Sequence, residues 1–250
     1  MKRREVVKLV IRTSGAALGA GLLTGALGGC SSSRRVSNGR LGEPIPDDPS
    51  VTHAPPTRIE PWSPPPGAQT TPPPSPGPAI QGVISRARWA KGRPRPWLAD
   101  PMNGVRRITV HHDGMSPFSS SSWGSAAHRI EAIRNAHTSK GWADIGYHYV
   151  IDPAGRIWQA RPLSLQGAHV KSANPHNLGI CVLGNFERQR PTDAAVRALE
   201  DLIASEMRRW RVPLGEVRTH QELAPTACPG RALQARMNAT RARGGRLRRA

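Results

Sequence analysis

Proline is distributed unevenly along this chain, and its distribution limits how much of the chain can fold. The chain has 25 prolines, and they include the triplets Pro64-Pro65-Pro66 and Pro72-Pro73-Pro74. Residues 31–80 surround them with Ser, Thr, Gly and Ala and with few large apolar side chains. Such a segment cannot bury enough apolar surface to offset the entropy of ordering, and it samples extended polyproline II. We predict a Pro-rich disordered linker at 31–80. We expect this linker to act as a semi-rigid spacer. The alternative is that it serves as a ligand for a proline-binding partner.

Residues 1–30 have the parts of an export signal. Lys2-Arg3-Arg4 is positively charged, and Val6 to Leu27 is mildly apolar and rich in Gly and Ala. The segment closes with Leu27-Gly28-Gly29-Cys30, which resembles a bacterial lipobox, and Arg3-Arg4 resembles a twin-arginine signal. An uncleaved membrane helix is the alternative, but the glycines and weak hydrophobicity disfavour a stable span. We predict lipidation at Cys30, and hence an exported protein, lipid-anchored to a bacterial membrane and facing the periplasm or cell wall.

The charge balance permits several kinds of anionic partner. Lys and Arg number 36 against 17 Asp and Glu, so the formal net charge is +19. Nucleic acid, anionic lipid and anionic cell-wall polymers could all be attracted to such a chain. The basic residues are spread out, however, and are not interleaved with aromatics as a strand-binding groove requires. We predict no nucleic-acid partner, and we expect a monomer.

Hydrophobic patterning predicts alternating strands and helices after residue 81. Strands are indicated by β-branched or apolar runs, and helices by apolar residues at helical spacing. The predicted strands are 107–111, 145–151 paired with 156–160 as a hairpin, 178–183 and 217–219. The predicted helices are 123–139, one capped by Thr192 that runs to Trp210, and 231–239, after which an Arg-rich tail at 241–250 is expected to fray.

This order of elements predicts a single α/β domain. We expect a central mixed β-sheet flanked by about three α-helices, spanning residues 81–240. Signal peptide and linker precede that domain.

One late segment offers two metal ligands. His220 and Cys228 lie eight residues apart in a loop that follows a short predicted strand. Imidazole and thiolate both suit zinc, and a catalytic zinc needs three protein ligands and one open position. His111-His112, at the end of another predicted strand, could supply the third ligand. Because a strand alternates its faces, only one of this pair can point to a given side.

The spacing of these residues does not establish a metal site by itself. A single histidine is commonly a surface or core residue, and the chain has nine. Cys228 could be a small buried hydrophobe or could pair with Cys181. Against that pairing, Cys181 lies inside an apolar run, where an inert buried thiol is expected, and three cysteines make a disulfide framework improbable.

Several motifs in order make the chain similar to a known family. From about Val83 to Met237 it resembles the zinc-dependent N-acetylmuramoyl-L-alanine amidases of the peptidoglycan recognition protein and phage-lysozyme type. The matching pieces are Ile84-Ser85-Arg86 with Trp89, Ile108-Thr109-Val110-His111-His112, Gly141 to Tyr149, Gly167-Ala168-His169, Asn177-Leu178-Gly179-Ile180, Gly184-Asn185 and His220 to Gly230.

The resemblance implies a role for particular residues. It implies that His111, His220 and Cys228 hold Zn²⁺, which selects His111 over His112. It implies a catalytic role for Tyr147, although position alone favours a core aromatic of a strand. The position two before the cysteine, Thr226 here, carries threonine in those recognition proteins that have amidase activity. His169 resembles a residue that lines the substrate cleft, and Asn177 is expected to shape that cleft.

The implied reaction is hydrolysis of the amide between N-acetylmuramic acid and L-alanine in peptidoglycan. An amide is a poor electrophile, and zinc both activates water near neutral pH and polarises a carbonyl. Members of the family without the cysteine bind peptidoglycan without cutting it. A non-hydrolytic peptidoglycan-binding module is therefore the alternative function, and the presence of Cys228 favours hydrolysis.

Overall fold

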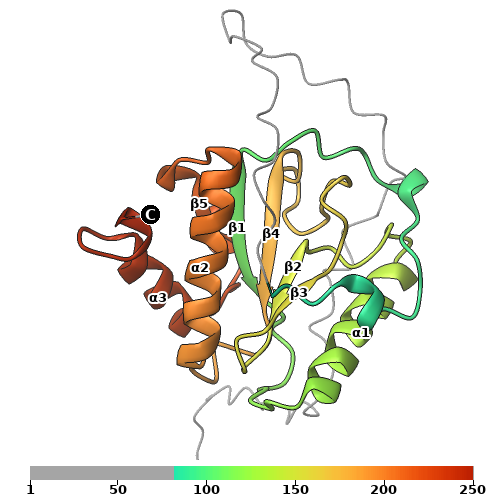
Figure 1. Ribbon diagram of the computed structural model, residues 1–250, viewed down its shortest axis with the longest axis horizontal. Helices are drawn as coiled ribbons and strands as arrows, with labels where there is room; N and C mark the ends of the chain where they lie inside the picture. Colours follow the sequence, from blue (N-terminus) through green and yellow to red (C-terminus); the bar gives the residue numbers. More distant parts are fainter. Residues whose placement is uncertain (1–81, 250) are drawn as a thin grey trace, which may run out of the picture. The chain divides into compact units, whose positions relative to one another are not determined.

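The computed structural model describes residues 82–249 (Figure 1). The predicted signal segment with Cys30 and the predicted Pro-rich linker lie outside these residues, so they remain predictions. Within them the chain forms one mixed sheet with helices on both faces. The predicted α/β fold is confirmed.

The sheet has five strands in the order β3-β2-β4-β1-β5. Their bounds are β1 Arg107–His112, β2 Tyr149–Ile151, β3 Ile157–Gln159, β4 Asn177–Val182 and β5 Val217–Thr219. β1 pairs in parallel with both β4 and β5, and β2 pairs in parallel with β4. Only β3 runs antiparallel to its neighbour, as the second strand of the β2–β3 hairpin. The ends of β1, β4 and β5 therefore lie at one edge, which is where parallel sheets commonly carry a site.

Three α-helices cover the sheet. α1 (Trp123–Ser139) lies on one face, and α2 (Asp193–Trp210) and α3 (Arg231–Arg241) lie on the other (Figure 1). Short 3-10 turns lie at Arg86–Arg88, Pro96–Leu98, Leu214–Glu216, His220–Glu222 and Leu247–Arg249. The helix starts follow ordinary capping chemistry, since the hydroxyls of Ser122 and Thr192 accept backbone N–H groups of α1 and α2.

Side-chain alternation divides the interior into two apolar layers. Ile108 and Val110 of β1 pack with the buried residues of α2 and α3, including Leu199 and Leu233. On the other face, the α1 residues Ala126, Ile130 and Ile133 pack against a layer that includes Cys181. Since neighbouring residues of a strand face opposite layers, Thr109 and His111 belong to the α1 side. The sheet thus presents His111 beside α1.

A buried carboxylate ties α2 to the sheet. Glu206 is fully buried, and its two oxygens accept hydrogen bonds from the Tyr149 hydroxyl at 3.1 Å and the Trp210 indole N–H at 2.8 Å. Arg209 adds an ion pair at 3.4 Å. A buried carboxylate without partners would strongly destabilise the fold. The two hydrogen bonds and the ion pair therefore offset the cost of burying the Glu206 charge.

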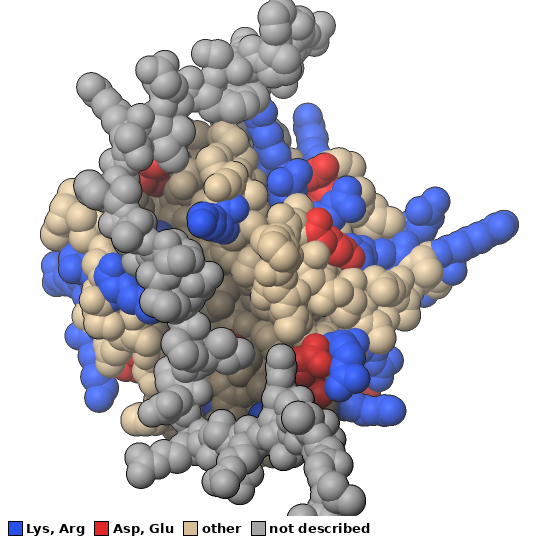
Figure 2. Space-filling model, turned by 180° about the vertical axis from the view of Figure 1, so that it is seen from behind, with Lys and Arg blue, Asp and Glu red and all other residues tan. Residues whose placement is uncertain are grey.

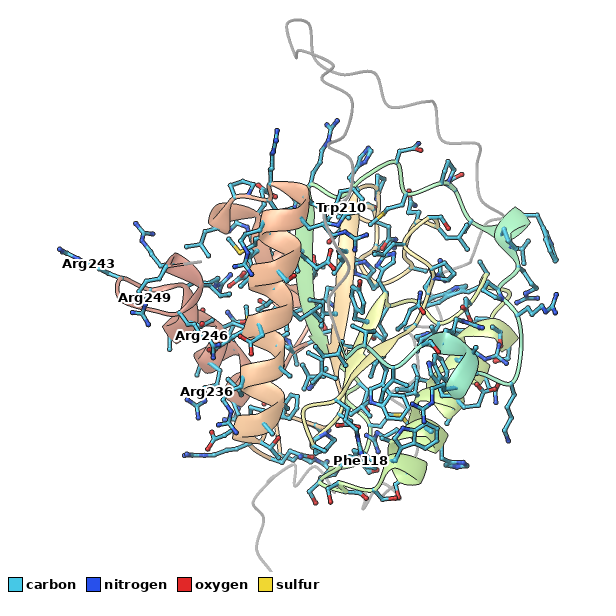
Figure 3. All side chains as sticks on the ribbon, in the orientation of Figure 1. Phe118, Trp210, Arg236, Arg243, Arg246 and Arg249 are labelled. Atoms are coloured by element: carbon cyan, nitrogen blue, oxygen red, sulfur yellow. The ribbon has the colours of Figure 1, made fainter. Side chains whose placement is uncertain are left out.

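The C-terminal segment packs instead of fraying. α3 continues to Arg241, two residues past its predicted end, and Leu247 is 1% exposed within the layer between the sheet and α2. Arg246 forms ion pairs with Glu200 and Asp201 of α2. Arg243, in contrast, extends away from the domain (Figure 3). A single leucine among arginines was too weak a periodic signal to predict this packing.

Leu247→Ala is expected to destabilise the domain by about 2–5 kcal/mol, the usual range for a buried leucine. The matched control is Arg248→Ala, an exposed neighbour in the same turn, which should change the free energy of unfolding by no more than about 0.5 kcal/mol. Urea unfolding of both variants measures the difference. Equal stability of the two variants would show that the segment does not pack in solution.

Candidate metal centre

Three predicted ligands converge at one edge of the sheet. The ligand atoms of His111, His220 and Cys228 all lie within 4.8 Å of one another. His111 is the penultimate residue of β1, His220 directly follows β5, and Cys228 lies at the end of the loop after it. The Cys228 Sγ lies 3.6 Å from the His111 Nδ1, and the ring centroids of His111 and His220 are 4.7 Å apart. The structure therefore brings together the set that the resemblance implied.

His112 lies on the opposite side of its strand. Its Nδ1 accepts a hydrogen bond from the Phe186 N–H at 3.2 Å, and its ring lies 6.0 Å from the Phe186 ring. Phe186 belongs to the layer beneath α2 and α3. Strand alternation alone left the choice within the histidine pair open, and these contacts show which member faces the cluster.

The loop that carries the second and third ligands is closed by its own hydrogen bonds. Gln221 N–H donates to the Cys228 carbonyl at 2.8 Å, which fixes the loop ends against each other. The Thr226 hydroxyl accepts from the Cys228 N–H at 3.2 Å. Thr226 itself is exposed, so its hydroxyl proton is free to donate to another molecule. The loop thus places the Thr226 hydroxyl two residues from the Cys228 thiol.

Glu222 attaches this loop to α3. Its carboxylate accepts two hydrogen bonds from the Arg241 guanidinium, at 2.6 and 2.8 Å, and one from the Thr219 N–H at 2.9 Å. Burial by itself raises the pKa of Glu222, but the donors at Arg241, Thr219 and Gln234 lower that pKa to about 2. The carboxylate is therefore ionised throughout the physiological range.

Burial keeps the two histidine ligands neutral. It lowers the pKa of His111 well below the ordinary value, and the neighbouring His169 and His220 lower it further. Burial also lowers the pKa of His220. Burial raises the pKa of the Cys228 thiol to about 12 in the metal-free protein. Two neutral imidazoles and a thiol that a divalent cation can deprotonate form a donor set that fits zinc.

Tyr147 lies beside this donor set. Its ring centroid is 5.1 Å from that of His111, and its side chain is half-buried. Burial raises the pKa of Tyr147 well above the ordinary value, with Cys181 and Cys228 adding to the shift. The hydroxyl makes no hydrogen bond to another residue in the described part of the chain. It is therefore a protonated donor that remains available to a bound molecule.

His137 is a supporting residue that the sequence did not single out. It lies in α1, and its Nδ1 accepts a hydrogen bond from the Gly146 N–H at 3.0 Å. Its ring packs 4.6 Å from Trp142 and 5.8 Å from Tyr147. Burial lowers the pKa of His137 to about 4, so it can serve as a neutral acceptor. It holds the backbone just before Tyr147.

His169 and Asn177 are buried rather than open to a cleft. His169 is 8% exposed and Asn177 is 0% exposed. The Asn177 side chain accepts from the Thr109 hydroxyl at 2.8 Å and donates to the Ala173 carbonyl at 2.7 Å. Both ring nitrogens of His169 have protein partners. The contacts of His169 and Asn177 with substrate remain predictions.

The loop between β1 and α1 borders a hollow beside the first half of α1. This cavity of about 530 Å³ is lined by Met115, Phe118, Gly124, Ser125, His128, Arg129 and Ala132. Arg129 is buried and pairs with Asp113 at 2.5 Å, and its guanidinium lies 4.7 Å from the Phe118 ring. The loop that follows the first ligand is therefore held in place.

Comparisons with known proteins agree with this geometry. A family model described as N-acetylmuramoyl-L-alanine amidase matches residues 101–231. Peptidoglycan-recognition protein SC1a of Drosophila melanogaster is 29% identical over 150 residues, which are 59% of this chain and 80% of that protein. The structure of Drosophila peptidoglycan recognition protein LB has a TM-score of 0.58 and 26% identity, over 63% of this chain and 92% of that chain.

A third relative has been solved with a ligand. Peptidoglycan recognition protein LE, in complex with tracheal cytotoxin (monomeric diaminopimelic acid-type peptidoglycan), has a TM-score of 0.58 and 25% identity. The match covers 64% of this chain and 94% of that one. Because the family model matches more than half of the 250 residues and spans the whole candidate site, this chain belongs to the N-acetylmuramoyl-L-alanine amidase family.

Proposed function

We propose that this protein is a zinc-dependent N-acetylmuramoyl-L-alanine amidase that hydrolyses the amide between N-acetylmuramic acid and L-alanine in peptidoglycan. The observation that carries the proposal is the convergence of His111, His220 and Cys228, with the ring of Tyr147 beside His111 and its hydroxyl without a hydrogen-bond partner among residues 82–249. Family membership supports the substrate class. The relative crystallised with tracheal cytotoxin supports recognition of muropeptides.

Each residue of the site has a distinct task in this proposal. His111, His220 and Cys228 would hold the zinc ion, which supplies water activation near neutral pH and carbonyl polarisation when bound. Tyr147 stays protonated, so its hydroxyl would donate a hydrogen bond to the oxygen that gains charge as the amide is attacked. The Thr226 hydroxyl, whose oxygen accepts from the Cys228 N–H, would donate a hydrogen bond to the same substrate oxygen.

The surface charge is consistent with an anionic environment such as a cell wall. Arginine and lysine side chains project around the face in Figure 2, and most acidic side chains visible there lie against basic ones. The formal net charge of +19 belongs to the whole chain. Such a field raises the local concentration of anionic partners without specifying one.

A purely binding role is the second candidate. It is favoured by the similarity to peptidoglycan recognition proteins, which are named for recognition rather than cleavage. The two functions differ in whether free stem peptides appear when the protein is incubated with purified cell wall. Binding without release of peptides would leave the recognition role as the function.

Cys228→Ser is expected to abolish hydrolysis and weaken zinc binding, because a serine hydroxyl is a poor replacement for a thiolate ligand. The matched control is Cys181→Ala, which removes a buried thiol from the α1-side layer and should retain metal binding. Zinc content and release of stem peptides are measured for both, before and after chelation. A Cys228→Ser protein that cuts as fast as the parent would contradict the zinc mechanism.

Tyr147→Phe is expected to lower kcat by about 10²–10³-fold, the typical loss when one donor to a developing oxyanion is removed. Muropeptide affinity and zinc content should stay close to the parent values. Tyr149→Phe is the control, since that hydroxyl bonds to Glu206 on the other face of the sheet. Steady-state kinetics and binding titrations separate the two effects. An unchanged kcat in Tyr147→Phe rules out this role.

We also propose that the chain is exported and anchored by lipid at Cys30. The support is the lipobox-like Leu27-Gly28-Gly29-Cys30 and the Pro-rich stretch that follows it. In the span that the structure describes, no helix has the length and apolar character to cross a membrane.

Cys30→Ala is expected to abolish incorporation of labelled fatty acid in a bacterial host, because the cysteine thiol is the acylated group. The matched control is Ser31→Ala, one residue later, which should still be labelled. Membrane fractionation provides a second measurement. Equal labelling of the two variants would refute the anchor.

A further inference from the structure

A chain of hydrogen bonds leads from the first proposed zinc ligand into the protein. The His111 Nε2 lies 3.0 Å from the His169 Nδ1, and the His169 Nε2 lies 3.0 Å from the Asn177 backbone carbonyl. All three groups are buried. The other nitrogen of the first ring, His111 Nδ1, faces the Cys228 Sγ at 3.6 Å. His169 therefore lies behind the ligand, on the side away from the donor cluster.

The chemistry of these groups fixes the direction of the bonds. A carbonyl oxygen can only accept a hydrogen bond. The His169 Nε2 must therefore carry a proton and donate a hydrogen bond to the Asn177 carbonyl. In a neutral imidazole the other nitrogen then has a free lone pair, so His169 Nδ1 accepts from His111 Nε2–H. His111 is left with its lone pair on Nδ1, the atom that faces Cys228.

We propose that His169 is a positioning residue that holds His111 in the tautomer and ring orientation that present Nδ1 to the zinc ion. This inference rests on the proposed function, because it assumes that the cluster binds zinc. Ligand histidines generally donate their second N–H to a carbonyl, carboxylate or water. Here a second histidine, His169, accepts that hydrogen bond, and His169 is itself hydrogen-bonded to the backbone of β4.

The surroundings of His169 are shaped to hold its ring. A Cβ atom placed on Gly167 would lie 2.4 Å from the ring Cδ2, and one on Gly179 would lie 2.6 Å from it. Both distances are too short for any side chain, so these glycines leave the space that the imidazole occupies. The backbone N–H of His169 also donates to the Asn174 side-chain oxygen at 2.9 Å. The two glycines therefore border the ring closely, and a hydrogen bond holds its backbone.

A neighbouring histidine serves as a matched control. His148 is equally buried, and its ring centroid lies 5.9 Å from that of His169. Its Nδ1 accepts from the Gly179 N–H at 3.0 Å, and its Nε2 lies 3.1 Å from the Leu165 carbonyl. No contact between His148 and His111 occurs in the described residues. Substituting His148 therefore measures how much stability is lost when a buried imidazole with two hydrogen bonds is removed.

The experiment compares His169→Leu, His169→Gln and His148→Gln in the full-length protein. Zinc affinity is measured by competition with a chromophoric chelator, and the stability of each metal-free protein by urea unfolding. We expect His169→Leu to bind zinc about 10–100-fold more weakly, the usual effect of removing such an outer partner. His169→Gln should recover much of this loss, because its amide oxygen can accept and its NH₂ can donate. His148→Gln should lose stability but keep its zinc affinity.

The tautomer gives a measurement that does not depend on the variants folding. Nitrogen-15 NMR of the metal-free parent protein should show the proton of the His111 ring on Nε2. A folded His169→Leu protein with parent zinc affinity, or a His111 proton found on Nδ1, would overturn the inference. A parent protein that binds no zinc overturns the proposed function instead, so the two failures are distinguishable.

Discussion

The parallel pairing of β1 with both β4 and β5 determines where the site can form. Parallel strands place their C-terminal ends at the same edge, so His111 at the end of β1 and His220 just after β5 approach each other across one pair of hydrogen-bonded strands. The same pairing aligns His111 with Cys181 of β4. The loop from β5 then needs only eight residues to bring Cys228 to the cluster. A slip of one residue in this register would turn His112 inward and remove His111 from the site.

Burial of this cluster sets its electrostatics. His111, His169 and His220 lie close together in the interior, and the pKa of each is lowered chiefly by burial and further by other histidines. Positive charges so close in a low-dielectric region would repel strongly. Neutral imidazoles leave lone pairs that need a partner. In the proposed function a divalent cation would be that partner at the cluster, and the Asn177 carbonyl accepts the hydrogen bond at the far end of the network.

The sequence predicted the periodic parts of the fold better than its irregular parts. The α1 stripe of Ala126, Ile130 and Ile133 gave the helix bounds 123–139 that the structure has, because an amphipathic helix repeats its apolar residues at short range. Strand alternation showed that His111 and His112 face opposite sides, but not which faces the site. The choice depended on resemblance, and the contact of His112 with Phe186 comes from a segment distant in sequence. The hydrogen bonds of His137 and His169 likewise depend on loops whose course no short-range pattern specifies.

The ligand loop also depends on the end of the chain. The ion pair of Glu222 with Arg241 connects the loop to the last residue of α3, and Leu247 packs behind that helix. Bidentate, charge-assisted bonds of this kind fix orientation as well as distance. Because its donors lower the pKa of Glu222 to about 2, their stabilisation is present above the ordinary glutamate pKa of about 4.3 and is lost as pH falls towards 2. The C-terminal segment therefore contributes no ligand but helps to hold the ligand loop: without the ion pair to Arg241, the loop closed by Gln221 and Cys228 would lose this attachment to α3, while its contacts with β5 would remain.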